Sequence, residues 1–112
     1  MLDQYAVGVP LKDVINDFMI YEDNMGDFFY WQNSEYIQVW MEQLYDTKKG
    51  TEILQDGVYL RITTEDLAHL KADLTQHQND ANTNFKVNME FVKEAEDVIN
   101  NLNMAVYYNC SW

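Results

Sequence analysis

The chain has 112 residues, enough for one compact domain with a single modest hydrophobic core. Apolar residues make up 47% of the chain and aromatic residues 14%, a composition that argues against a disordered protein. Nineteen Asp and Glu residues stand against seven Lys and Arg residues. The formal net charge of −12 therefore argues against direct binding to nucleic acid or to an anionic membrane.

The first third of the chain predicts a strand, a helix and an aromatic extended segment. Residues 1–9 are mostly apolar and are expected to pair as a strand. From Pro10 to about Tyr21, apolar residues recur at spacings of three and four, which predicts a helix. Gly26 and its neighbours interrupt this pattern, and the aromatic run at residues 28–31 is expected to be extended.

A second helix is predicted in the middle of the chain. Asn33 or Ser34 can cap its start. Its apolar face carries Ile37, Trp40, Met41, Leu44 and Tyr45. Lys48 and Lys49 suit the end of a helix, and Gly50 is a natural stop.

A turn, a strand and a third helix are expected next. Asp56-Gly57 is a turn signal, and residues 58–62 have the β-branched and aromatic content of a strand. Thr63 with Asp66 three residues later predicts a capping box. The helix that follows carries an apolar stripe and is expected to end near His77. Its stripe consists of Leu67, Leu70 and Leu74.

The last third predicts a loop, a helix and a strand. Residues 78–84 are polar and are expected to form a mobile loop, after which Asn88 can cap the last helix. The core face of that helix is expected to carry Phe91, Ala95, Val98, Ile99 and Leu102. Residues 104–108 predict a well-covered strand. The sum is a single α+β domain, residues 1–112, with about four helices packed on one face of a sheet of two to four strands.

Acidic residues form two ridges on the predicted helices. At 100° per residue, Glu90, Glu94 and Asp97 share one ridge of the last helix, and Asp66 and Asp73 share a ridge of the third. Carboxylates on a rigid ridge can imitate a row of phosphates and occupy a basic nucleic-acid-binding groove. The alternative interpretation is a solvated face of an acidic protein.

Aromatic residues are the second candidate feature. If exposed, Trp31, Trp40, Tyr108 and Trp112 are candidate anchors for a protein partner. Tyr30 and Trp31 can alternatively line a pocket for a small nucleotide, with Arg61 to offset its charge. Aromatic residues at this density usually belong to the core.

The sequence offers little for catalysis or for a metal. Asp66, His69, Asp73 and His77 are metal-ligand types at helical spacing, but ion pairing between Asp and His explains the spacing equally well. Cys110, the only cysteine, has no catalytic signature and excludes a disulfide within the chain. We therefore expect a binding protein and not an enzyme, with no cofactor and no metal. A reducing cytoplasm is the simplest setting, because residues 1–9 lack the basic start of a signal peptide and no apolar run is long enough to span a membrane.

A set of motifs resembles a family of small bacteriophage and bacterial proteins of unassigned function. The motifs are Tyr30-Trp31-Gln32-Asn33, Trp40-Met41, residues 45–50, residues 58–63, Glu65-Asp66-Leu67 with Leu70 and Asp73, residues 91–95, and Val106-Tyr107-Tyr108 with Ser111-Trp112. They span residues 28–112. The chain departs from the family at Gln32, where a basic residue is usual, and at residues 82–88, which retain only Phe85 of an aromatic and glycine-rich element. The resemblance implies a phage or mobile-element origin and supplies no activity.

Two functions are compatible with these features. The first is a phage-encoded acidic protein that inhibits a host defence or nucleic-acid-handling protein, such as a nuclease complex of the restriction or CRISPR type, by stoichiometric binding to a basic surface. The second is a protein that sequesters a small signalling nucleotide in an aromatic pocket. A homodimer is left open in either case.

Overall fold

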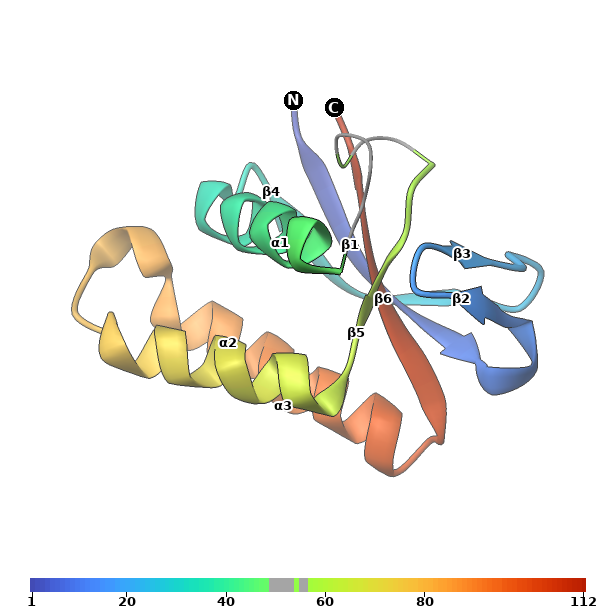
Figure 1. Cartoon of the computed structure of the whole chain (residues 1–112). Coiled ribbons are helices and arrows are strands. Elements are labelled where there is room, and N and C mark those ends of the chain that lie inside the picture. The colour runs from blue at the N-terminus through green and yellow to red at the C-terminus, as the bar shows by residue number, and fades with distance from the viewer. Residues whose placement is uncertain (49–53, 55–56) are drawn as a thin grey trace.

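The computed structural model describes residues 1–48, 54 and 57–112, and it is an α+β fold (Figure 1). In chain order the elements are β1 (Asp3–Pro10), η1 (Leu11–Asp13), β2 (Val14–Asn16), β3 (Met19–Ile20), β4 (Gly26–Gln32), α1 (Glu35–Thr47), β5 (Leu60–Ile62), α2 (Thr64–Gln76), η2 (Ala81–Thr83), α3 (Phe85–Asn100) and β6 (Met104–Ser111). The α+β class is confirmed, and the described residues contain three α-helices instead of about four.

The main sheet is antiparallel, with the strand order β4-β1-β6-β5, and β2 and β3 form a separate two-stranded hairpin. Strands β1 and β6 pair along their whole length, from Asp3 opposite Ser111 to Pro10 opposite Met104. The predicted strands at residues 1–9 and 104–108 are confirmed, and β6 lies between two neighbours as its lack of charge predicted.

All three helices cover one face of the sheet, as expected from the sequence. Their apolar faces enclose one core with residues such as Ala6, Leu60 and Val106 from the strands. The opposite face carries a smaller cluster in which Tyr59 and Tyr107 pack near Ile20 of the hairpin. Within the part of the chain that is described, none of the helices is both long and apolar enough to cross a membrane.

The helix predicted from Pro10 to about Tyr21 is wrong. One turn of 3-10 helix leads instead into the β2–β3 hairpin. The side-chain oxygen of Asn16 accepts a hydrogen bond from the backbone N–H of Phe18 at 2.8 Å, which reverses the chain. This local turn overrides a helical spacing of apolar residues.

Long-range hydrogen bonds hold the hairpin on the main sheet. The Tyr107 hydroxyl donates to the Asn16 carbonyl at 2.6 Å, and the Arg61 N–H donates to the Asp17 carbonyl at 2.8 Å. Tyr107 and Arg61 are paired residues of β6 and β5. Because the Arg61 N–H bonds to Asp17, the hairpin covers the edge of β5 that does not pair with β6. Edge strands covered in this way are protected from unwanted pairing.

The structure confirms the predicted N-terminal caps of two of the three described α-helices. Ser34 caps α1, and Thr63 with Asp66 forms the predicted capping box of α2. Asn88 does not cap α3, because the helix begins at Phe85 after Asn84, whose φ of 46° is left-handed.

One residue of the predicted core face of α3 is not in the core: Leu102 is 58% exposed and lies beyond the helix end. The predicted helix end at Lys49 and Gly50 and the predicted turn at Asp56 lie outside the described residues.

A buried polar network joins α1 to the centre of the sheet. The side-chain amide of Gln4 donates to the Tyr108 hydroxyl at 3.0 Å and to the Ser34 carbonyl at 2.9 Å. The Tyr108 hydroxyl in turn donates to the Gln38 side-chain oxygen. Gln4 and Tyr108 are fully buried, and burial raises the pKa of the Tyr108 hydroxyl above its ordinary value, so it stays a neutral donor.

Replacing Tyr108 by Phe should lower the free energy of unfolding by about 1–3 kcal/mol, because the amide groups of Gln4 and Gln38 would lose a partner inside the core. Tyr21→Phe is the matched control, because Tyr21 is 59% exposed and makes no such bond. Urea unfolding monitored by circular dichroism measures both variants. Equal stability of Y108F and Y21F would contradict the importance of the network.

Candidate functional site

The predicted ridge of α3 is formed, but it is not uniformly acidic. Glu90, Glu94 and Asp97 are exposed along a shallow hollow of about 1210 Å³ between α3 and α2. The other charged residues of this hollow are Glu96, Lys71, Lys86 and Lys93. Three ammonium groups therefore alternate with four carboxylates, and the face carries little net charge. This arrangement is a poor imitation of a row of phosphates.

Asp66 and Asp73 turn away from that face and toward α1. Asp66 is buried, where its carboxylate accepts bonds from Lys48 Nζ at 2.6 Å and from the Thr63 N–H at 2.9 Å. Lys48 is the C-cap residue of α1 and also donates to the Arg61 carbonyl at 2.6 Å. Asp73 accepts a hydrogen bond from the Tyr36 hydroxyl of α1. The two predicted ridges therefore do not form one surface. The ion pair of Asp66 with Lys48 links α1, α2 and β5.

Two of the four predicted aromatic anchors are in the core. Tyr108 is fully buried, and Trp31 is 5% exposed with its indole N–H bonded to the Asn88 side-chain oxygen at 2.8 Å. Asn88 also donates to the Thr83 carbonyl at 2.7 Å, which explains why it is buried inside α3 and does not cap it. Exposure was a condition of the anchor prediction, so only the half-buried Trp40 and the 64% exposed Trp112 meet it.

The predicted nucleotide residues do not meet at one site. Tyr30 and Trp31 line a groove of about 870 Å³ between α1, η2 and the end of β4. Arg61 lies elsewhere, on β5 opposite Tyr107 and under the hairpin. The charged residues lining the groove are Glu35 and Asp73, and no described Lys, Arg or His lines it. An anionic nucleotide would meet two carboxylates there, and this disfavours the second function.

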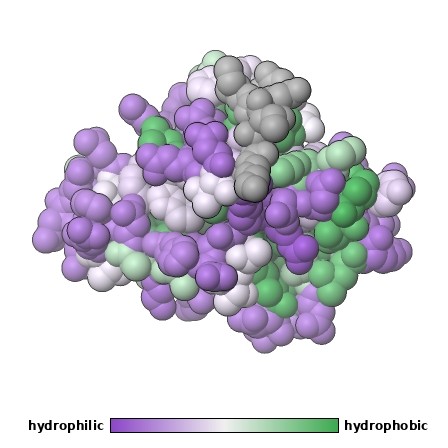
Figure 2. Space-filling view, viewed as in Figure 1, coloured by the Kyte–Doolittle hydropathy of each residue, from purple (hydrophilic) through white to green (hydrophobic). Residues whose placement is uncertain are grey.

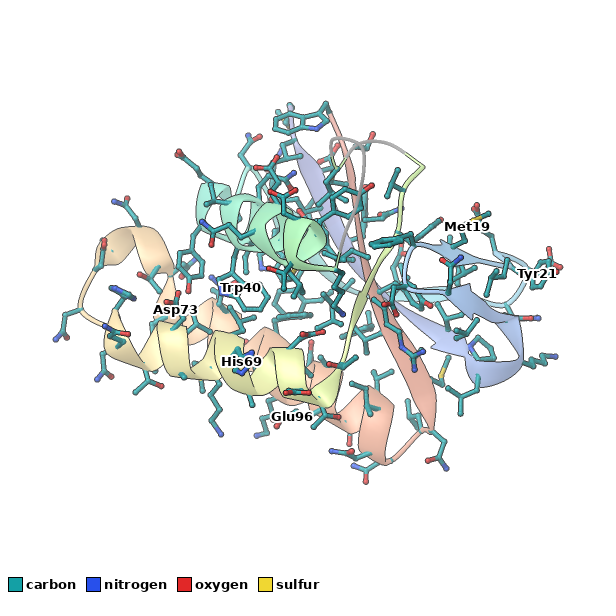
Figure 3. All side chains as sticks on the ribbon, in the orientation of Figure 1. Met19, Tyr21, Trp40, His69, Asp73 and Glu96 are labelled. Carbon is teal, nitrogen blue, oxygen red and sulfur yellow. The ribbon has the colours of Figure 1, made fainter. Side chains whose placement is uncertain are left out.

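The sequence did not predict a group of exposed apolar side chains near the N-terminal end of the chain. Leu11, Ile15, Met19 and Tyr21 are all exposed on η1 and the β2–β3 hairpin, from 43% for Ile15 to 59% for Tyr21. Figure 2 shows apolar side chains gathered over this hairpin, and Figure 3 shows Met19 and Tyr21 pointing away from the sheet. We call these four residues and their acidic neighbours the hairpin surface.

Acidic side chains surround the apolar part of the hairpin surface. Its acidic neighbours are the exposed Asp17, Glu22, Asp23 and Asp27. Lys12 is the one basic residue in residues 10–32, and Arg61 of β5 lies beside Asp17, so the four carboxylates outnumber the two nearby basic residues. The helix prediction hid this surface, because it took Leu11, Ile15 and Met19 as part of the apolar repeat of a helix. The Asn16-Asp17 dipeptide was the signal for a turn.

The described residues contain no group of three His, Cys, Asp or Glu side chains that could hold a metal ion. Of the predicted metal-ligand types, His69 is exposed, and His77 lies 3.6 Å from Asp73 as an i,i+4 pair. Cys110 is buried in β6, where Gln38 approaches its sulfur at 3.8 Å. Comparison with models of protein families, with curated proteins and with solved structures gave no match for this chain.

The ion pair of Asp66 should make part of the stability depend on acid pH. Burial alone would raise the pKa of Asp66, but the hydrogen bonds from Lys48 and Thr63 outweigh it and hold the pKa below its ordinary value of 3.8. The carboxylate therefore stabilises the fold above pH 3.8, and this contribution is lost as the pH falls through the lower pKa of the folded chain.

We expect Asp66→Asn to lower the free energy of unfolding by about 1–3 kcal/mol at pH 7. Below about pH 4 the stability of this variant should depend less on pH than that of the parent chain. Glu65→Gln is the control, since Glu65 is the exposed acidic neighbour on the same turn of α2. Urea unfolding from pH 7 to pH 2 measures both. If D66N and E65Q followed the same curve as the parent chain, the ion pair would not stabilise the fold.

Proposed function

We propose that this chain is a stoichiometric binding protein that docks on a basic and partly apolar surface of another protein. The observation that supports the proposal is the hairpin surface, where exposed apolar side chains lie next to carboxylates that outnumber the basic residues near them. Single exposed apolar residues are ordinary in soluble proteins. Several on one projecting hairpin with an acidic rim are typical of a protein-binding site.

The two parts of the hairpin surface would contribute differently to binding. Burial of side chains such as Ile15 and Met19 provides short-range free energy, at about 25 cal/mol per Å² of apolar surface removed from water. The carboxylates of Glu22 and Asp23, together with the net charge of −12, accelerate association with a basic partner. Apolar anchors with a charged rim form the usual anatomy of such interfaces.

The partner that fits this chemistry is a protein with a basic surface, such as a nuclease or another nucleic-acid-binding protein. Basic surfaces of this kind normally contact phosphates, so a bound acidic protein competes with nucleic acid and inhibits. The resemblance of residues 28–112 to small phage proteins supports a bacterial host protein as the target, and hence action in the host cytoplasm.

The apolar part is tested by Met19→Ser, with Leu102→Ser as the matched control. The two side chains are 56% and 58% exposed, but only Met19 belongs to the hairpin surface. The tagged chain is used to capture partners from a bacterial lysate, which mass spectrometry identifies, and the affinity of the purified pair is then measured. We expect M19S to weaken binding about tenfold and L102S to leave it unchanged. Equal affinity of the two variants would place the interface elsewhere.

The acidic part is tested by reversing charges. Glu22→Lys with Asp23→Lys should slow association about tenfold at low salt, and the difference should shrink as salt is added. Glu90→Lys with Glu94→Lys is the control, because these residues lie on the α3 face of mixed charge. Stopped-flow association rates at several salt concentrations are the measurement. A larger effect from the α3 pair would shift the interface to that helix.

A further inference from the structure

The groove between α1, η2 and β4 is a second feature that the hairpin surface leaves unused. Its volume of about 870 Å³ is in the range of small-ligand sites. Helix α1 contributes Tyr36, Val39, Trp40 and Gln43 to its wall, and η2 with the start of α3 contributes Asn82 and Asn84. Figure 3 shows Trp40 of α1 and Asp73 of α2 in the space between these two helices.

The charges of the groove all have one sign. Glu35 and Asp73 are its charged lining residues, which gives a formal charge of −2 without any cation from the described residues. The Tyr36 hydroxyl donates to one oxygen of Asp73, and the other oxygen is 3.6 Å from His77 Nδ1, too far for a hydrogen bond. Burial and the bond to Asp73 raise the pKa of Tyr36 above its ordinary value, so its hydroxyl keeps the proton and holds the carboxylate in place.

The remaining groups of the groove accept hydrogen bonds or offer aromatic rings. The side chains of Gln43, Asn82 and Asn84 make no hydrogen bond to any described residue, so their carbonyl oxygens can accept from a ligand. Trp40 is half-buried with its indole ring at the groove. A tryptophan ring attracts cations to its face, and carboxylates and amide oxygens accept hydrogen bonds from them.

We propose that this groove binds the guanidinium group of an arginine side chain presented by another protein. A guanidinium is planar, stacks on an indole ring and carries five N–H donors, which matches Trp40, the carboxylate of Asp73 and the surrounding amide oxygens. Free arginine is the alternative ligand, and the titration below distinguishes it from an arginine within a chain, whose flanking backbone can also contact the open groove. The groove and the hairpin surface lie on opposite sides of the molecule in Figure 3, so the two proposals can fail separately.

The test titrates the protein with N-acetyl-arginine amide and follows the indole N–H signal of Trp40 by NMR. N-acetyl-citrulline amide, a neutral molecule of the same shape, N-acetyl-lysine amide and free arginine are titrated in parallel. We expect the arginine amide to bind, citrulline amide to produce no saturable shift, and lysine amide and free arginine to bind several-fold more weakly. Binding of citrulline amide, tighter binding of free arginine or lysine amide, or no shift at all would overturn the proposal.

Variants locate the site within the protein. Asp73→Asn should weaken binding of the arginine amide about fivefold, and Trp40→Leu, which keeps an apolar side chain, about threefold. Because the Trp40→Leu variant lacks the indole signal, the backbone amide signals of the groove follow the titration of every variant. Asp46→Asn is the control, since Asp46 is an exposed acid of α1 outside the groove and the variant changes the net charge equally. The hairpin variant M19S should bind the arginine amide like the parent chain. If D46N weakened binding as much as D73N, net charge and not the groove would be responsible.

Discussion

The hydroxyl of Tyr108 is the point on which the arrangement of α1 over the sheet depends. It lies on the central strand β6, accepts from Gln4 of the neighbouring strand and donates to Gln38 of α1. These three polar side chains are enclosed by an apolar core and fix the position of α1. Any shift of α1 would leave a buried amide without its hydrogen-bond partner. The position of α1 in turn determines both the groove beside Trp40 and the place of Lys48, which pairs with Asp66 of α2.

The sequence predicted the elements whose signals are local. The capping box of Thr63 and Asp66, the Ser34 cap and the strand character of residues 104–108 each depend on residues a few positions apart. The failure at residues 10–21 has the opposite cause. Apolar residues at spacings of three and four fit either a helix or a short hairpin, and bonds from Tyr107 and Arg61, far along the chain, favour the hairpin.

The candidate site was predicted less well, because exposure is a tertiary property. The sequence identified Trp31 and Tyr108 as aromatic residues of interest but could not show that they face the core. It placed Glu90 on an exposed ridge correctly, but not the neighbouring Lys71, which comes from another helix. The hairpin surface was missed because the residues that form it were predicted to be a helix. One error of secondary structure thus concealed the feature on which the functional proposal now depends.

The pairing of β1 with β6 has a kinetic consequence. It joins residues about a hundred positions apart, as the bond between Gln4 and Tyr108 illustrates with a separation of 104. Closing so long a loop costs entropy before any core contact repays it, so folding should be slow for a chain of this size. Until β6 docks, the core lacks its central strand, and the apolar surface that this strand covers is exposed to aggregation. The net charge of −12 then keeps unfinished chains apart, so the same acidity that suits a basic partner also protects the folding chain.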